Sequence, residues 1–158
     1  MEKIPSFNVD HLRLQKGVYV SRIDKIGGHA LTTYDIRMKE PNKEPVLNTA
    51  ELHALEHLAA TYLRNEETIK DEVIYFGPMG CRTGFYLILK GNKASEDILP
   101  LLKDLFKFMS NYYEEIPGAT PKDCGNYQDM NLNMARFEAD LFLNVLDQIK
   151  ADQLVYPA

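Results

Sequence analysis

Residues 48–65 contain the pattern that most restricts the fold, because their apolar residues recur at the spacing of an α-helix. On a helix these residues form one stripe about 100° wide, the width expected for a face packed against a core. Asn48 followed by Glu51 has the form of a capping box and predicts that the helix begins at Asn48 or Thr49. The helix is expected to end near Asn65 and to bury Leu52, Leu55, Ala59, Tyr62 and Leu63.

Strands are predicted on both sides of this helix. Segments 17–23 and 31–39 precede it, with a turn at Gly27-Gly28 between them, and segments 72–76 and 84–90 follow it. The loop between the last two has a length that suits an antiparallel pair. Segment 31–39 alternates between apolar and polar residues, typical of a sheet with one buried face: Tyr34, Ile36 and Met38 against Asp35, Arg37 and Lys39.

Two further helices are expected in the second half of the chain. Ser95 is predicted to cap one of them, in which Pro100 forces a local kink or a late start, and the last helix occupies much of 130–150. Because strands and helices do not alternate regularly, the pattern favours an α+β fold with an antiparallel β-sheet packed against helices. With 158 residues and no repeat or linker-like run, residues 1–158 are expected to form a single domain.

Charge and composition exclude some classes of protein. The 18 Lys and Arg residues against 23 Asp and Glu give a net charge of −5, which argues against nucleic acid as a partner. No run approaches the roughly 18 apolar residues of a membrane span, and the opening segment lacks the apolar region of a secretory signal. We therefore expect a cytoplasmic protein without a membrane partner, whose two cysteines stay reduced and separate.

The predicted helix 48–65 carries His53 and His57, four residues apart. Residues at this spacing lie on one helix face about 6 Å apart along the axis, so both imidazoles can reach one metal ion. Glu56 lies between the histidines and the apolar stripe, where a partly desolvated carboxylate can act as a general base. The alternative is a solvated helix flank that binds no metal.

The two cysteines suggest different chemistry. Cys124 is a candidate third ligand, since two histidines and one cysteine with an open position are typical of a catalytic metal site. The alternative is an inert, partly buried thiol. Cys81 lies in a glycine-containing loop next to Arg82, whose charge would favour a reactive thiolate. Its alternative is a small apolar residue that fills the loop.

Several residues carry little signal by themselves. Arg37 is expected to be a solvated charge on the polar face of its strand, and Ser6 and His11 lie in what reads as a loosely packed terminal arm. The His-x-x-Glu-His motif is also the signature of inverted zinc peptidases, which gives a zinc-dependent peptidase-like hydrolase as the alternative function. Those peptidases are longer chains that take a downstream glutamate as third ligand. A third possibility is a non-catalytic interaction domain with a structural metal.

Five motif regions occur in order along nearly the whole chain. They are Ser6-Phe7 with Asp10-His11, Asp35-Ile36-Arg37 with Pro41-Asn42-Lys43, His53-x-Leu55-Glu56-His57, the run PMGCRTG at 78–84, and Cys124-Gly125. At these spacings the chain resembles the S-ribosylhomocysteine lyase (LuxS) family. The resemblance implies a metal-dependent carbon–sulfur lyase that cleaves S-ribosylhomocysteine by carbonyl migration and β-elimination. The products would be homocysteine and 4,5-dihydroxy-2,3-pentanedione, the precursor of a quorum-sensing autoinducer.

The resemblance also implies a role for each candidate residue. His53, His57 and Cys124 would hold one divalent metal per subunit, Fe²⁺ in the native enzymes and often Zn²⁺ in isolated ones. Glu56 and Cys81 would be the catalytic proton-transfer groups. Substrate binding would fall to residues that contact the ribose or organise the pocket, in homodimers with active sites at the subunit interface: Ser6, His11 and Arg37.

Three residues depart from the family pattern. Ala54 stands where many members have Thr, a change expected on the solvent side of the helix. Tyr75 replaces an Asp thought to meet the amino group of homocysteine, and Gly77 replaces a commoner Ser. The last two changes leave the binding of the amino-acid end of the substrate open.

Overall fold

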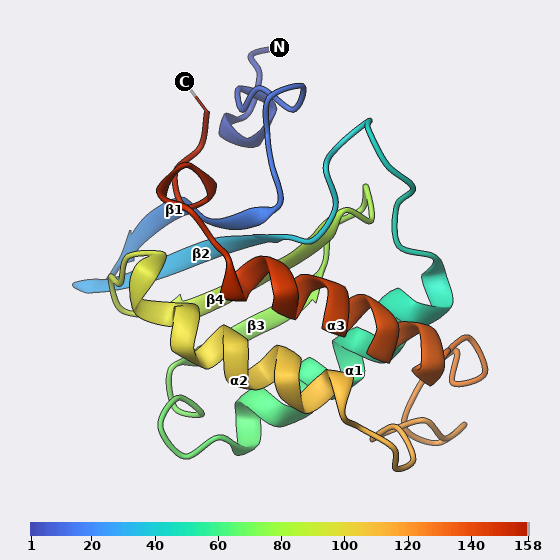
Figure 1. Cartoon of the computed structure of the whole chain (residues 1–158). Helices are drawn as coiled ribbons and strands as arrows, with labels where there is room; N and C mark the ends of the chain where they lie inside the picture. The colour runs from blue at the N-terminus through green and yellow to red at the C-terminus, as the bar shows by residue number, and fades with distance from the viewer. Residues whose placement is uncertain (158) are drawn as a thin grey trace.

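A computed structural model describes residues 1–157. Three α-helices lie together on one face of a sheet, which confirms the α+β class with an antiparallel sheet packed against helices (Figure 1). The strands are β1 (Gly17–Ile26), β2 (His29–Arg37), β3 (Val73–Pro78) and β4 (Gly84–Lys90). The α-helices are α1 (Thr49–Asn65), α2 (Leu99–Ser110) and α3 (Leu132–Asp147), and short 3₁₀ helices cover Pro5–Phe7, Glu96–Ile98 and Ala151–Gln153. No helix among residues 1–157 is both long and apolar enough to cross a membrane.

The sheet is antiparallel throughout, in the order β1-β2-β4-β3. The predicted turn at Gly27-Gly28 joins β1 to β2, and both glycines have positive φ (54° and 81°). The twist of a two-residue turn with positive φ matches the twist of the two strands that it joins. Glycine is favoured in such a turn because L side chains rarely adopt positive φ. The loop at residues 79–83 joins the predicted antiparallel pair β3 and β4.

Helix α1 is buried more widely than the sequence pattern predicts. All five residues of the predicted stripe are at least half-buried, and Leu58 is also fully buried. Ala54 is fully buried too, so its expected place on the solvent side is wrong. The physical reason is that α1 packs against α3 as well as against β3, so a second side of the helix is covered.

The outer face of the sheet, away from the helices, is also covered near the start of β1 and the end of β2. Asp35 and Arg37 are only 0% and 3% exposed, so the prediction of a solvated Arg37 is wrong. The N-terminal segment and the C-terminal tail meet over this face and contribute residues to one pocket with Arg37. The two chain ends accordingly lie at the same end of the molecule (Figure 1).

Two helix starts differ in how they form. Pro100 occupies the first turn of α2, after the 3₁₀ turn Glu96–Ile98, which confirms the late start. Ser95 does not cap α2, because Ile98 takes the N-cap position. The Ser95 hydroxyl is buried, with no hydrogen-bond partner in the described part of the chain.

The start of α1 follows the sequence prediction. The Asn48 backbone N–H donates to Glu51 Oε1 at 2.8 Å, which is the reciprocal half of the predicted capping box. Glu51 is 3% exposed, so its carboxylate is held in place by packing as well as by this bond. The first turn of α1 leads directly into His53.

We expect Glu51→Ala to lower the free energy of unfolding by about 1–2 kcal/mol, because it removes the cap acceptor and leaves the Asn48 N–H without its partner. Urea denaturation followed by circular dichroism measures the change. The matched control is Glu114→Ala at an exposed position, which should shift the midpoint little. Equal effects of the two substitutions would contradict the role of the cap.

Candidate active site

Three possible metal ligands converge from two segments. His53 and His57 lie on α1, and Cys124 lies in the loop that precedes α3. One ligand atom from each residue lies within 4.8 Å of the other two. The imidazole centroids are 4.8 Å apart, and Cys124 Sγ is 3.4 Å from His53 Nε2. The structure thus brings together the three residues that the sequence suggested as ligands, and we call them the His–His–Cys cluster.

Backbone carbonyls set the orientation of both imidazoles. His53 Nδ1 is 3.0 Å from the Asp129 oxygen, and His57 Nδ1 is 2.7 Å from the Pro117 oxygen. Because a carbonyl oxygen only accepts, each Nδ1 donates its proton to the backbone, which leaves Nε2 as the nitrogen available to a metal. This is the usual arrangement of metal-binding histidines, whose second nitrogen is held by an outer partner.

The loop before α3 is shaped to approach α1 closely. Gly118 has a positive φ of 72°, and a Cβ there would lie 3.3 Å from His57 Nδ1. Further along, Asn131 caps α3 by accepting from the Met134 N–H, and its own N–H donates to the Ala50 oxygen. The loop is therefore anchored to α1 on both sides of Cys124.

The donor set fits a divalent transition metal. Two imidazole nitrogens and a thiolate are ligands of Zn²⁺ and Fe²⁺, and three protein ligands leave a position for water or substrate. The Asn126 N–H donates to Cys124 Sγ at 3.4 Å. Glu56 is half-buried on the same helix, three residues after His53 and directly before His57.

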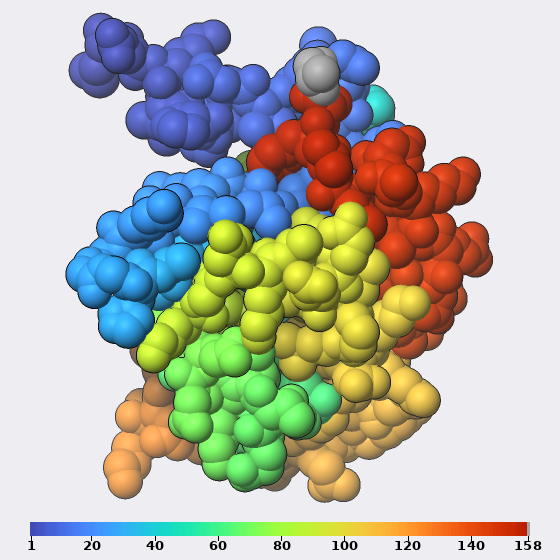
Figure 2. Space-filling view, turned by 90° about the vertical axis from the view of Figure 1, so that its left-hand side faces the viewer, coloured from blue at the N-terminus to red at the C-terminus, as the bar shows by residue number. Residues whose placement is uncertain are grey.

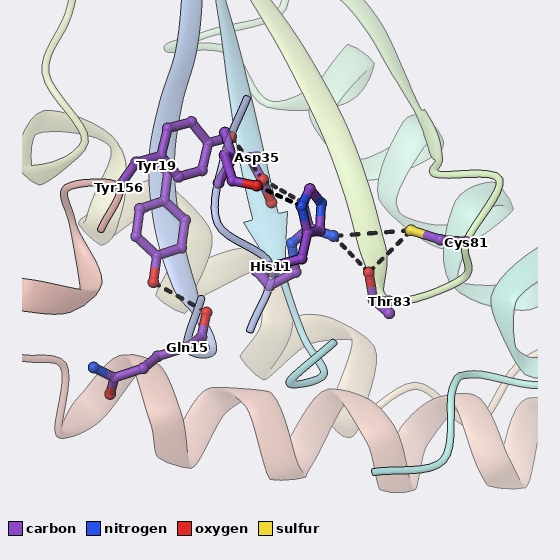
Figure 3. Close-up of polar contacts among 9 residues, drawn as sticks. His11, Gln15, Tyr19, Asp35, Cys81, Thr83 and Tyr156 are labelled. Carbon is purple, nitrogen blue, oxygen red and sulfur yellow. Dashed lines mark hydrogen bonds and ion pairs between the residues drawn. The ribbon is translucent and has the colours of Figure 1, made fainter. Parts of the chain in front are cut away.

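A second group of polar residues surrounds Cys81. The Cys81 sulfur is 3.1 Å from Thr83 Oγ1, and Arg37 Nη1 donates to Thr83 Oγ1 at 2.6 Å and to the sulfur at 3.8 Å (Figure 3). A pocket of about 260 Å³ opens beside these atoms. We call it the Cys81 pocket, and its lining includes Ser6, His11, Arg37, Cys81, Tyr86 and Tyr156.

These neighbours change the acidity of Cys81. Partial burial raises the pKa of the thiol, but the hydrogen bonds with Thr83 and the charge of Arg37 outweigh burial, so the net pKa is lowered. Arg82 does not supply the cation that the sequence suggested. Its backbone has a positive φ of 59°, and its guanidinium donates to the Leu47 oxygen at 3.2 Å.

Ser6 and His11, which carried little signal in the sequence, line the Cys81 pocket from the N-terminal segment. Both are half-buried, and His11 Nδ1 lies 2.8 Å from the Val9 oxygen. The start of this segment projects from the body of the molecule (Figure 2). The residues of the His–His–Cys cluster are not among those that line the Cys81 pocket.

Tyr75 and Gly77 are structurally linked. Tyr75 is 47% exposed and lines a neighbouring pocket of about 390 Å³, which shares Ser6 and Tyr86 with the Cys81 pocket. A Cβ on Gly77 would lie 1.9 Å from the Tyr75 hydroxyl oxygen. The two departures from the family pattern are therefore coupled, because this position of the tyrosine requires glycine at 77.

Sequence analysis missed four residues around Cys81. Asp35 and Thr83 could have been found, since Asp35 and Arg37 share a strand face and Thr83 is two residues from Cys81. Tyr86 and Tyr156 carry no local signal, because strand pairing and the path of the C-terminal tail bring them in.

Comparison with known proteins agrees with this geometry. Residues 4–153 match the family model described as S-Ribosylhomocysteinase (LuxS). A protein named S-ribosylhomocysteine lyase from Finegoldia magna is 61% identical over 157 residues, covering 99% of both chains. Lyases of the same name from Clostridium beijerinckii and Clostridium acetobutylicum are 61% and 59% identical, again over 99% of each chain. The chain therefore belongs to the S-ribosylhomocysteinase (LuxS) family.

Proposed function

We propose that this protein is an S-ribosylhomocysteine lyase, which cleaves S-ribosylhomocysteine to homocysteine and 4,5-dihydroxy-2,3-pentanedione. The observation that carries the proposal is the convergence of His53, His57 and Cys124 in a chain 61% identical, over 99% of its length, to a protein named for this activity. The alternative of a peptidase-like hydrolase has no comparable support, because the third residue of the cluster is a thiol rather than a downstream glutamate.

The reaction requires a Lewis acid and groups that move protons. The carbonyl of the sugar moves along the chain by successive proton shifts before the thioether leaves, and each shift develops negative charge on a sugar oxygen. A divalent ion held by His53, His57 and Cys124 would supply the positive charge that stabilises this oxygen. We propose Fe²⁺ as the native ion, with Zn²⁺ in isolated protein, since both accept nitrogen and sulfur ligands.

We assign the proton transfers to Glu56 and Cys81. Glu56 lies beside the histidines on α1, and Cys81 lies on the loop between β3 and β4, so the two groups can serve different carbons of one substrate. The lowered pKa of Cys81 increases the thiolate fraction near neutral pH, and only the thiolate accepts a proton.

Substrate binding is proposed for the residues of the Cys81 pocket. Ser6 and His11 line its wall and offer hydrogen bonds suited to ribose hydroxyls. Arg37 already bonds Asp35 and Thr83, so its proposed part is to organise the pocket around Cys81. Tyr75 lines the neighbouring pocket, which supports a proposed place for the amino-acid end of the substrate there.

A homodimer would bring the two groups of residues together. The His–His–Cys cluster and the Cys81 pocket share no residue, and several large apolar residues on the N-terminal segment and the outer strands are exposed. Large exposed apolar residues are a feature of protein interfaces. We propose that a second copy covers the following residues: Ile4, Phe7, Leu12, Ile74 and Tyr75.

The product would serve either autoinducer synthesis for quorum sensing or the recycling of the methyl cycle. A cytoplasmic location is also proposed, since both cysteines are free and thiols stay reduced in that compartment.

The activity is tested by release of a thiol from S-ribosylhomocysteine. We expect the metal-loaded protein to liberate homocysteine, and Glu56→Gln to lower kcat by at least about 100-fold while the metal content is unchanged. Glu66→Gln, at the end of the same helix, is the matched control and should keep full activity. A wild-type protein that releases no thiol would refute the function, and loss of metal in Glu56→Gln would make Glu56 a ligand instead.

The two cysteines should respond differently to substitution. Cys124→Ala removes a ligand and should reduce bound metal, from about one ion per chain, by roughly tenfold. Cys81→Ala should keep the metal and lose turnover. Elemental analysis of purified variants measures both, and equal metal contents in the two variants would contradict the division of roles.

Mixing the two cysteine variants tests the shared site. If the His–His–Cys cluster of one subunit works with the Cys81 pocket of the other, a mixed dimer of Cys124→Ala and Cys81→Ala contains one intact site. Random mixing should then restore about a quarter of the wild-type activity. Sedimentation velocity checks that the wild-type protein is a dimer. A monomer, or mixtures without activity, would refute the shared site.

A further inference from the structure

The C-terminal tail folds back against the start of β1. Gln153 Nε2 donates to the Lys16 oxygen at 2.9 Å, and Gln15 Nε2 donates to Asp152 Oδ2 at 3.2 Å. The Gln153 carbonyl passes so close to Gly17 that a Cβ there would lie 2.2 Å from its oxygen. These contacts hold the tail in a defined path over the outer face of the sheet.

This path places Tyr156 next to Asp35. The Tyr156 ring stacks on Tyr19 with centroids 4.9 Å apart and planes 12° apart, and its hydroxyl donates to Asp35 Oδ2 at 2.7 Å (Figure 3). Burial and the neighbouring Asp35 carboxylate raise the pKa of Tyr156, so the hydroxyl keeps its proton and remains a donor.

The buried ion pair between Asp35 and Arg37 is joined by one contact only. Asp35 Oδ2 accepts from Arg37 Nη2 at 2.5 Å and from the Tyr156 hydroxyl. Asp35 Oδ1 and Arg37 Nε are both buried and have no hydrogen-bond partner among residues 1–157. A two-contact pair through Nε and Nη2 would satisfy both atoms, and arginine and carboxylate commonly pair in this way.

The single contact leaves one terminal nitrogen of Arg37 free to reach Thr83 and Cys81. With Nη2 on Asp35, the other terminal nitrogen of Arg37, Nη1, reaches Thr83 Oγ1 at 2.6 Å and Cys81 Sγ at 3.8 Å. Asp35 Oδ2 accepts its second hydrogen bond from the Tyr156 hydroxyl, so this hydroxyl is the contact that can hold the carboxylate in its one-contact orientation.

We propose that Tyr156 is a positioning residue for Cys81. Its hydroxyl occupies Asp35 Oδ2 and holds the carboxylate in an orientation that keeps Arg37 directed at Thr83 and Cys81. The consequence for the reaction rests on the proposed function, in which Cys81 transfers a proton. The effect of Tyr156 on the position of Arg37 and on the acidity of Cys81 does not depend on the proposed function.

Six titratable or charged groups surround the thiol and the ion pair. They are Tyr19 from β1, Asp35 and Arg37 from β2, Tyr86 from β4, His11 from the N-terminal segment and Tyr156 from the tail. Arg37 favours the thiolate, whereas the Asp35 carboxylate opposes it. The position of Arg37 therefore decides much of the acidity of Cys81.

The test is the substitution Tyr156→Phe, which keeps the stacked ring and removes the hydroxyl. The rate of alkylation of Cys81 by iodoacetamide is measured against pH, with the site resolved by mass spectrometry. Since the thiolate exists above the pKa, loss of the nearby cation should shift the midpoint upward. We expect a shift of roughly half a unit or more, so that alkylation at neutral pH slows about threefold.

Two further variants make the result decisive. Tyr19→Phe removes the hydroxyl of the other stacked ring, which donates to the Gln15 oxygen at 3.0 Å, and should leave the midpoint unchanged. Thr83→Val removes the hydrogen bond to the sulfur and should raise the midpoint, which shows that the assay detects the environment of Cys81. Thermal melts confirm that all variants fold.

An unchanged or lowered midpoint in Tyr156→Phe would overturn the proposal, as would an equal shift in Tyr19→Phe. Alkylation needs no turnover, so this result is independent of whether the protein cleaves S-ribosylhomocysteine. If it does, the acidic limb of kcat should move upward with the alkylation midpoint. A lyase assay without activity, combined with a shifted midpoint, would refute the proposed function and leave the positioning role intact.

Discussion

The burial of α1 is the constraint on which the candidate metal site depends. Leu55 and Leu58 are fully buried in the core and Ala54 is fully buried as well, so the rotation of the helix about its axis is determined. With that rotation, His53 and His57 lie on the side of the helix that faces the loop before α3. The carbonyls of Pro117 and Asp129 then orient the rings, so the geometry of the cluster follows from core packing and two backbone contacts.

The outer face of the sheet carries a buried ion pair between Asp35 and Arg37. Burying Asp35 and Arg37 costs desolvation energy, and a buried ion pair is weak evidence for stability. The pair instead orients the Arg37 side chain, so that its other terminal nitrogen points toward Thr83 and Cys81. The two chain ends that cover the pair also supply Ser6, His11 and Tyr156 to the same pocket. The residues that cover this face of the sheet therefore also line the Cys81 pocket.

The two groups of chemical residues lie on different elements for a physical reason. The proposed metal ligands must be rigid, and a long helix with an anchored loop provides this rigidity. The proposed proton-transfer thiol needs a lowered pKa, and a loop beside a buried arginine provides the nearby charge. Tyr75 and Gly77 show that the rim of the pocket is also coupled, since a side chain at 77 would displace the tyrosine ring.

The helices and strands and the candidate ligands His53 and His57 could be read from the sequence alone. The period of its apolar residues specified α1 and the strands, and the spacing of His53 and His57 is a property of any helix, so no tertiary contact was needed to place them on one face. Cys124 could be named as a third ligand only as one of two alternatives. Three features depend on the tertiary structure. They are the burial of Arg37, the presence of Arg37 rather than Arg82 beside Cys81, and the position of Tyr156. They depend on contacts between segments as far apart as Asp35 and Tyr156, and local periodicity carries no information about such contacts.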